Sequence, residues 1–212
     1  MDEAVERLGL RERQRRAVAD ELREVGFQLF EERGFDAVPA VEIAAAAGVS
    51  ERTFFRYFPT KEDVVLTVLE GIGPDVVSRL EAAPLDRSWF EILREVYTAV
   101  LAIDVTMEGR RGDEIRRYAG RGYRLLQSSA RLRAGMDARA RVSAAAVAEV
   151  IARRSGLDID HDPRPRVWAT MVIAAIGADV ERRVAVGAEH TDLGTEVFDA
   201  LQGLFDPPAG PS

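Results

Sequence analysis

The 212-residue sequence contains no cysteine, one lysine and two histidines. The absence of cysteine excludes disulfide bonds, thiol catalysis and zinc–thiolate sites. Two histidines are too few for most metal sites or catalytic triads. No apolar run approaches the roughly 18 residues that a membrane-spanning helix needs, and the N-terminal residues lack the apolar core of a signal peptide. These absences favour a cytoplasmic protein that needs no metal or cofactor and is not an enzyme.

The sequence also lacks the alternation of apolar and polar residues that indicates β-strands. Apolar residues instead recur at helical spacing along most of the chain, which predicts an all-α fold of about nine helices. The expected ranges are about 12–33, 40–47, 51–57, 61–82 with a kink or break at Gly71, Gly73 and Pro74, 88–103, 113–127, 131–154, 162–186 and 191–205.

Residues that favour helix ends support these boundaries. Glycine tolerates the positive φ that commonly follows a helix, so Gly34 and Gly48 are expected to end the first two helices. Capping side chains are expected at Ser50, in the pairs Thr60–Asp63 and Ser88–Glu91, and at Asp162 before Pro163.

The segment 41–61 has the layout of a helix-turn-helix, in which the second helix enters the major groove of DNA. Its two short helices are separated by a tight turn around Gly48. Phe54 and Phe58 are four residues apart and should both point into a small core. The outer face of the second helix then carries Glu51, Arg52, Phe55 and Arg56.

The distribution of charge argues against DNA binding at first sight. The whole chain has a net charge of −7, and residues 1–60 carry a net charge of −3, whereas residues 110–141 carry +7. A DNA-binding head of this composition would depend on a local basic patch. The candidates for that patch are Arg11, Arg13, Arg15, Arg16, Arg52, Arg56 and Lys61.

Over about its first 65 residues the chain resembles TetR-family transcriptional repressors. The resemblance is carried by Leu29-Phe30, Gly34-Phe35, Ile43-Ala44, Ala47-Gly48-Val49-Ser50, Thr53-Phe54-Phe55-Arg56-Tyr57-Phe58 and Lys61. It implies a homodimer that binds a palindromic operator in double-stranded DNA and is released by a small ligand. It further implies that DNA is contacted by Ser50, Arg52, Thr53, Phe55, Arg56 and Tyr57, with Lys61 meeting a phosphate.

Two positions depart from the family pattern. Members generally carry a serine or threonine near Val38 or Pro39, which caps the second helix and touches a phosphate, and neither residue here has a hydroxyl. Phe55 stands where tyrosine is common, so a hydrogen bond from that ring to phosphate is lost. The ring can still pack on a sugar or a thymine methyl group.

The resemblance and the helix pattern together predict three parts: a DNA-binding domain over 1–60, a helical ligand-binding and dimerisation domain over 61–206, and a flexible tail over 207–212. The dimer should form through the helices expected over 162–186 and 191–205. Within the first of these, small residues would allow close approach of a second copy: Ala174, Ala175, Gly177 and Ala178.

Aromatic, aliphatic and methionine side chains of the C-terminal part could line a ligand pocket or could form an ordinary core. The candidates are Leu69, Phe90, Leu93, Tyr97, Leu101, Met107, Tyr118, Tyr123, Leu126, Val147, Trp168 and Met171. The arginines over 110–141 are either a solvated face or the mouth of a pocket for an acidic ligand. A small hydrophobic or acidic-amphipathic effector is therefore expected, and relatives with the same Thr53–Phe58 sequence are thought to bind acyl-coenzyme A or fatty acids.

Two alternative functions belong to other classes. The acidic head and the missing hydroxyl at 38–39 would suit a helical small-molecule sensor or carrier whose head no longer binds DNA. A helical-bundle enzyme would need a nucleophile or metal constellation that the sequence does not offer. The run 158–162 begins like a calcium loop, but it continues with Pro163 and has Ala169 at the twelfth position, so Asp162 is interpreted as a helix cap.

Overall fold

The computed structural model describes residues 2–69, 72–84, 86–106 and 110–186, and its side-chain description leaves out 2–12, 72, 101–106, 110–116, 180 and 183–186. Every regular element in this part of the chain is a helix, which confirms the predicted all-α class. The helices are α1 (Asp2–Arg33), α2 (Ala40–Ala46), α3 (Glu51–Tyr57), α4 (Asp63–Leu69), α5 (Ile72–Ala82), α6 (Trp89–Thr106), α7 (Arg110–Ser128), α8 (Ala130–Ser155) and α9 (Arg164–Val186).

One helix begins earlier than the sequence indicated, and another contains two of the residues at which a kink or break was expected. Helix α1 begins at Asp2, ten residues before the expected start, and α5 begins at Ile72, so that Gly73 and Pro74 lie in its first turn. Proline is tolerated there because the first N–H groups of a helix have no partner within the helix. The helix expected over 191–205 and the tail over 207–212 lie outside the described residues.

The chain forms two compact units. The first contains Met1–Leu69 and Arg121–Gly135, and the second contains Glu70–Gly120 and Met136–Ser212. The first unit thus takes in α4, the end of α7 and the start of α8, in addition to the three helices expected in a DNA-binding domain. The functional division of the chain at residue 60 stays a prediction.

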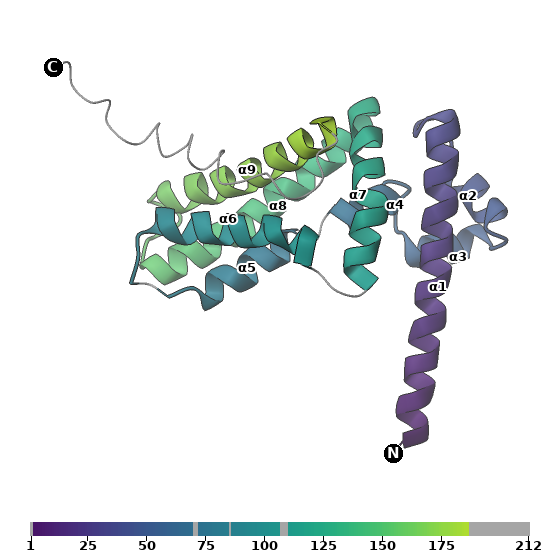
Figure 1. The fold of residues 1–212 in the computed structure, drawn as a ribbon, viewed down its shortest axis with the longest axis horizontal. Coiled ribbons are helices and arrows are strands. Elements are labelled where there is room, and N and C mark those ends of the chain that lie inside the picture. The colour runs from purple at the N-terminus through teal and green to yellow at the C-terminus, as the bar shows by residue number, and fades with distance from the viewer. Residues whose placement is uncertain (1, 70–71, 85, 107–109, 187–212) are drawn as a thin grey trace. The chain divides into compact units, whose positions relative to one another are not determined.

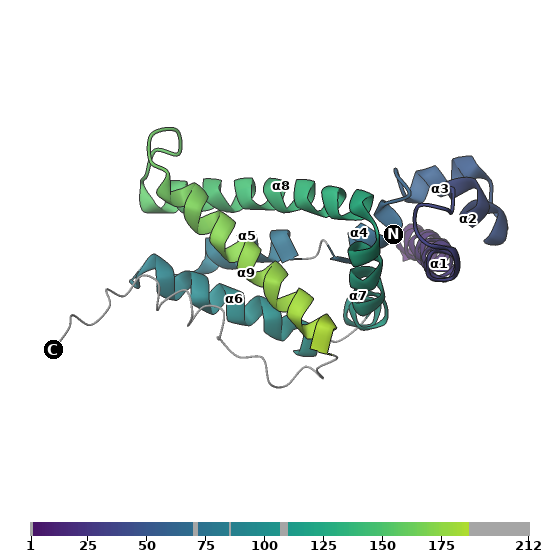
Figure 2. The same ribbon diagram turned by 90° about the horizontal axis from the view of Figure 1, so that it is seen from above.

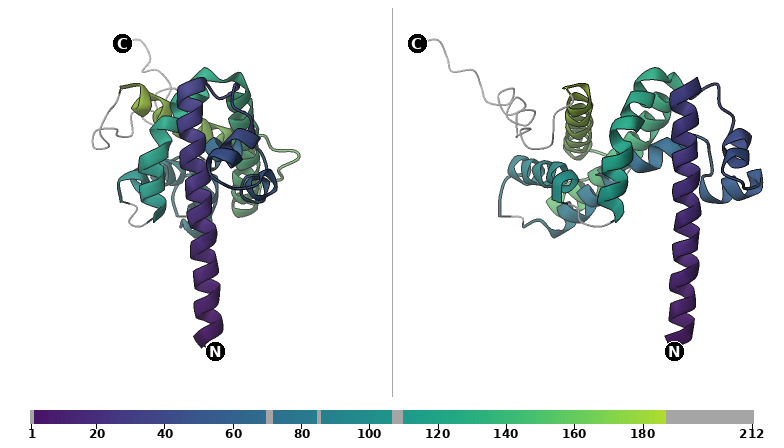
Figure 3. Two further views of the ribbon diagram at one scale, coloured as in Figure 1. Left: turned by 90° about the vertical axis from the view of Figure 1, so that its right-hand side faces the viewer. Right: turned by 45° about the vertical axis from the view of Figure 1, so that its right-hand side comes forward.

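Helices α1 to α4 enclose the core of the first unit. Helix α1 packs against α2 and α4, and α2 packs against α3, as Figure 1 shows for α1 to α3. The buried face of α1 contains Leu22, Gly26, Phe27 and Phe30, and at Gly26 a Cβ atom would lie 2.9 Å from Val64 Cγ1 of α4. The N-terminal part of α1 extends past α2 and α3 in both views of Figure 3.

The second unit has a separate apolar core. Helices α5, α6, α8 and α9 all contribute to it, and Figure 2 shows them from above. Tyr97 of α6 and Ile151 of α8 are almost completely buried in this core. Trp89 and Trp168 stack at its edge with ring centroids 6.1 Å apart. None of the described helices is long and apolar enough to span a lipid bilayer.

Candidate nucleic-acid interface

The turn between α2 and α3 depends on Gly48. Its φ angle is +67°, a conformation that glycine adopts without the strain of a side chain. The backbone N–H of Ala47 donates to the carbonyl of Ile43 at 3.0 Å, and that of Val49 donates to Ala44 at 2.9 Å. These bonds close α2 and direct the chain into α3.

Ser50 caps α3 as the sequence indicated. It has extended backbone angles, and its hydroxyl oxygen accepts the backbone N–H of Thr53 at 3.1 Å. The Ser50 and Thr53 hydroxyls also lie 2.9 Å apart. Because both hydroxyls take part in this local arrangement, the start of α3 has a defined orientation before any partner binds.

Helix α3 buries one face and exposes the other. Phe54 is fully buried and Phe58 is 3% exposed, with their ring centroids 5.8 Å apart. Glu51, Arg52, Phe55 and Arg56 are exposed, as the spacing predicted. Phe55 has 43% of its surface accessible, although its ring edge also contacts Phe54. An exposed aromatic ring between two arginines is suited to the base edges and sugars of a DNA groove.

Arg56 and Tyr57 form a pair at the end of α3. The guanidinium carbon of Arg56 lies 5.1 Å from the centre of the Tyr57 ring, and Nη2 donates to the Tyr57 hydroxyl at 3.5 Å. Arg56 remains exposed, whereas Tyr57 and Thr53 are half-buried. The predicted contact residues thus fall into two groups: an exposed group that reaches outward and a half-buried group that supports it.

The start of α2 lacks a side-chain cap, as expected from the missing hydroxyl. Pro39 occupies the N-cap position and Ala40 is the first helical residue. Val38 is fully buried in the core of the first unit. A hydroxyl at 38 would therefore lie in the core and not on the surface.

Lys61 has an intramolecular partner that the sequence did not indicate. Its ammonium donates to the backbone carbonyl of Phe35 at 2.8 Å and lies 4.2 Å from the centre of the Phe35 ring. Partial burial of the ammonium lowers the pKa of Lys61, an effect that neighbouring Glu62 opposes. An ammonium has three N–H donors, so this bond leaves donors with which Lys61 could also reach a phosphate. Lys61 lies two residues before α4 begins, and the Asp63 carboxylate accepts the backbone N–H of Thr60 at 2.6 Å.

The negative charge of residues 1–69 is offset by arginines of residues 121–135, which belong to the same unit. Residues 1–69 carry a net charge of −4, and residues 121–135 carry four arginines and no acidic residue, so the first unit has a net charge of zero. Glu42 pairs with Arg33, and Glu62 with Arg131 of α8. Glu24 and Glu31 pair with Arg121 of α7. The acidity of the segment 1–60 therefore does not persist in the folded unit.

The predicted ligand-binding side chains are distributed over both units. Leu69, Tyr123 and Leu126 belong to the first unit and are buried there. In the second unit, Leu93, Tyr97, Tyr118 and Val147 are buried, and Phe90, Trp168 and Met171 are partly buried against its core. The side chain of Leu101 and residue Met107 lie outside the described part of the chain. Many of these residues are thus packed core residues of their own unit, and a role for them in ligand binding stays a prediction.

The arginines that were candidates for a pocket mouth differ in their surroundings. Arg117 and Arg124 of α7 are exposed, and the side chains of Arg110, Arg111 and Arg116 lie outside the described residues. Arg121 donates to two glutamates of α1 and so does not point its guanidinium at a ligand. The hydrogen bonds from Arg121 to Glu31 lower the pKa of Glu31. No local sequence signal could have revealed this pairing, because 90 residues separate Arg121 from Glu31.

Comparison with known proteins connects both parts of the chain to one class. Residues 22–68 match the family described as bacterial regulatory proteins of the tetR family, and residues 90–206 match the MftR C-terminal domain. The HTH-type transcriptional regulator TcmR of Streptomyces glaucescens is 33% identical over 203 residues, which cover 93% of this chain and 84% of TcmR.

Solved structures support the same fold. NalD, the secondary repressor of the MexAB-OprM multidrug efflux pump in Pseudomonas aeruginosa, superposes with a TM-score of 0.54 at 18% identity, covering 90% of this chain and 94% of NalD. SmeT in its triclosan complex gives a TM-score of 0.53 at 18% identity, covering 92% of this chain and 98% of SmeT. At this level of identity the similarity concerns the fold.

The Ser50 cap leads to a testable prediction. We expect Ser50→Ala to lower the stability of the protein by about 1 kcal/mol, the usual cost of a lost N-cap, and to weaken binding to double-stranded DNA because α3 begins less well ordered. Thermal unfolding and a fluorescence-anisotropy titration with DNA measure the two effects. Ser88→Ala is the matched control, because Ser88 caps α6 in the second unit by accepting the N–H of Glu91 at 3.3 Å. Ser88→Ala should lower stability and leave DNA affinity unchanged, and a similar loss of DNA affinity in both variants would contradict the prediction.

Proposed function

This chain belongs to the TetR family of bacterial transcriptional regulators, and we propose that it is a repressor that binds a palindromic operator as a dimer and is released by a small-molecule effector. The observation that carries the proposal is the exposed face of α3, on which Arg52, Phe55 and Arg56 project from a helix fixed by buried Phe54 and capped by Ser50. An arginine can donate two hydrogen bonds to the O6 and N7 atoms of guanine in the major groove.

The remaining contacts would position the protein on the phosphate backbone. Lys61 can donate to a phosphate while it keeps its bond to Phe35. Arg13, Arg15 and Arg16 are exposed on the N-terminal part of α1 and can add sequence-independent attraction to the backbone. Ser50, Thr53 and Tyr57 complete the proposed contact set through hydroxyl groups at the two ends of α3.

The proposed dimer would form through α9. Ala174 and Ala178 are exposed on α9, and at Gly177 a Cβ atom would meet no atom within 4 Å. Ala175 is buried in its own unit and does not belong to this open face. A two-fold dimer needs its recognition helices about 34–36 Å apart, or a multiple of that distance, to enter equivalent grooves.

The proposed effector is a small hydrophobic or acidic-amphipathic molecule bound in the C-terminal part. Partly buried aromatic and methionine side chains, among them Phe90, Trp168 and Met171, border the core of the second unit, and side chains of this kind adapt to greasy ligands. A ligand of this class would act by favouring a conformation that binds the operator less well, with a coupling of typically 1–3 kcal/mol.

The operator contacts predict different effects at two positions. Purified protein should enrich specific fragments from genomic DNA. Arg56→Ala should bind these sites about 5- to 150-fold more weakly and relax base choice, since a good bidentate contact contributes about 1–3 kcal/mol of discrimination. Lys61→Ala should weaken binding to all sequences alike and lower the slope of affinity against salt by about one phosphate contact. Equal effects of the two changes on operator and random DNA would contradict these roles. Failure of the unaltered protein to bind any fragment would favour a sensor or carrier without DNA binding.

The proposed dimer interface predicts that a charge on α9 separates the subunits. Ala174→Glu should shift the protein from dimer to monomer in analytical ultracentrifugation, because two like charges would be brought together across the two-fold axis in an apolar contact. Val142→Glu is the control, since Val142 of α8 is exposed on the second unit, with 72% of its surface accessible. A dimer that survives Ala174→Glu, or dissociates equally with Val142→Glu, would place the interface elsewhere.

The effector class predicts ligand-dependent stabilisation. Fatty acids and acyl-coenzyme A species should raise the melting temperature of the protein, because a ligand that binds only the folded state stabilises it by mass action, by about 2.7 kcal/mol at a concentration of one hundred times Kd. The same ligands should release bound operator fragments. Absence of any thermal shift with both groups of ligands would remove this class of effector.

A further inference from the structure

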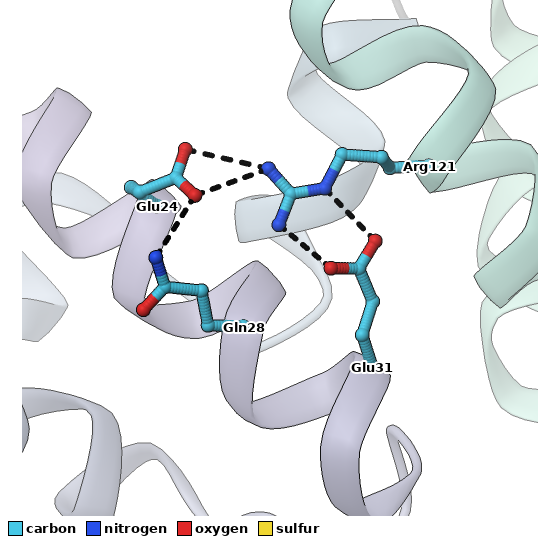
Figure 4. A network of polar contacts seen from close by, with 4 residues as sticks. All are labelled: Glu24, Gln28, Glu31 and Arg121. Carbon is cyan, nitrogen blue, oxygen red and sulfur yellow. Dashed lines mark hydrogen bonds and ion pairs between the residues drawn. The ribbon is translucent and has the colours of Figure 1, made fainter.

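The guanidinium of Arg121 bridges two carboxylates of α1. Nε and Nη2 each donate to one oxygen of Glu31 at 2.8 Å, which is the paired geometry typical of arginine and carboxylate. Nη1 donates to the two oxygens of Glu24 at 3.2 and 3.3 Å. Figure 4 shows the guanidinium held between both carboxylates. One side chain of α7 is thus bonded to α1 at two positions.

The partners of Arg121 occupy one face of α1. Glu24, Phe27 and Glu31 follow one another at spacings of three and four residues, which places them on the same side of a helix. The Arg121 guanidinium carbon lies 5.0 Å from the centre of the Phe27 ring, and Phe27 is itself fully buried. Gln28 donates to Glu24 at 3.1 Å and so orients that carboxylate. Arg121 therefore contacts two carboxylates and one aromatic ring on the same face of α1.

The arginine of the bridge is largely covered, whereas Glu31 stays exposed and Glu24 is half-buried. Only 18% of the Arg121 side chain is accessible, against 33% for Glu24 and 37% for Glu31. Partly desolvated, bidentate arginine pairs are stronger and geometrically more specific than exposed ones. A lysine could not replace this arrangement, because its ammonium does not form the planar pair with a carboxylate.

Arg121 stands at the residue where α7 enters the first unit. Residues 110–120 of this helix belong to the second unit and residues 121–128 to the first. At the next residue, Gly122, a Cβ atom would lie 3.5 Å from side-chain atoms of Leu69 and Val65 in α4. One turn of α7 therefore contacts α1 and α4, the two helices that flank the helix-turn-helix in the sequence.

We propose that Arg121 is a positioning residue for DNA recognition: through Glu24 and Glu31 it holds α1, and with it the helix-turn-helix, in the arrangement that binds the operator. Glu24, Glu31 and Arg121 all belong to the first unit, so the bridge acts within that unit. The inference rests on the proposed function and adds to it a residue that does not touch DNA.

The bridge stabilises the contact between α1 and α7, because one guanidinium shares its positive charge between two carboxylates that otherwise repel each other. Glu24 and Glu31 are both held next to one guanidinium, and Arg124 lies close enough to Glu31 to add to its stabilisation in the charged form. Without Arg121 these carboxylates lose their shared counter-charge and α1 loses its two bonds to α7. The arrangement that binds the operator then becomes a smaller fraction of the population, and the apparent affinity falls by that fraction.

Variants of this bridge test the proposal on operator fragments selected with the unaltered protein. Arg121→Gln should lower operator affinity about tenfold, within the range typical of coupled sites. Its affinity for random DNA and its salt slope should stay unchanged, because Arg121 contributes no phosphate contact. Arg117→Gln is the matched control, an exposed arginine one turn earlier on the same helix, and should leave operator affinity unchanged.

A charge exchange separates the bridge from a general effect on folding. Arg121→Glu places three carboxylates together and should bind the operator more weakly than Arg121→Gln, and adding Glu31→Arg should recover most of the lost affinity. Glu31→Gln removes one of the two carboxylates from the bridge with little change of side-chain shape. If thermal denaturation shows that another variant is unfolded at the assay temperature, Glu31→Gln is tested in its place.

The outcomes that overturn the proposal are distinct from those that overturn the proposed function. Operator affinity unchanged or raised in both Arg121→Gln and Glu31→Gln would refute the positioning role, as would an equal loss on operator and random DNA. Lack of rescue by the charge exchange in a folded protein would also refute it. Failure of the unaltered protein to bind DNA would instead remove the proposed function.

Discussion

The candidate DNA-binding surface depends on the burial of Phe54 and Phe58. Helix α3 has only seven residues, and a helix of this length is not stable alone in water. Its conformation is held by two aromatic rings on one side, packed in a core that also contains Phe30 and Phe35, whose ring centroids lie 4.8 Å apart. Fixing these rings fixes by geometry the direction of Arg52, Phe55 and Arg56 on the other side. The candidate DNA-binding surface is thus the outer face of a small aromatic core.

This core is supported by helices that come much later in the sequence. The first unit includes residues 121–135, and Leu66 of α4 contacts α8 so closely that a Cβ atom at Gly135 would lie 2.8 Å from its Cδ1. Helices α1 to α3 alone would bury little apolar surface, which makes a domain of this size only marginally stable. The candidate DNA-binding helices therefore share their unit with α4, the end of α7 and the start of α8.

The sequence predicted those features that depend on neighbouring residues. The Ser50 and Ser88 caps, the turn at Gly48 and the burial of Phe54 follow from local hydrogen bonding, backbone sterics and helical spacing, and the structure confirms each of them. Spacing alone does not decide the buried face of α1, because Val25 and Leu29 fit an apolar stripe as well as Phe27 does, yet of these three only Phe27 is fully buried. Tertiary packing decided between these faces, and spacing alone could not.

Pairings over long sequence distances could not be predicted in the same way. Lys61 meets the carbonyl of Phe35 across 26 residues, and Arg121 meets Glu31 across 90. A cluster of arginines in a sequence indicates where positive charge is available and does not indicate which carboxylate receives it. The interpretation of residues 110–141 as either a solvated face or a pocket mouth omitted a third use of charge, in which Arg121 binds the head.

The same pairing removes the objection that an acidic head should not bind DNA. The field at a surface depends on the charges that remain after close pairs have cancelled, and it is screened beyond about 10 Å at moderate salt. Arg121 and Arg131 return positive charge to a segment that lacks it, close to Glu24, Glu31 and Glu62. Arg52 and Arg56 are exposed on a unit whose formal net charge is zero. A protein with a net charge of −7 can therefore present arginines to phosphate and guanine, provided that the later helices keep the carboxylates of the head neutralised.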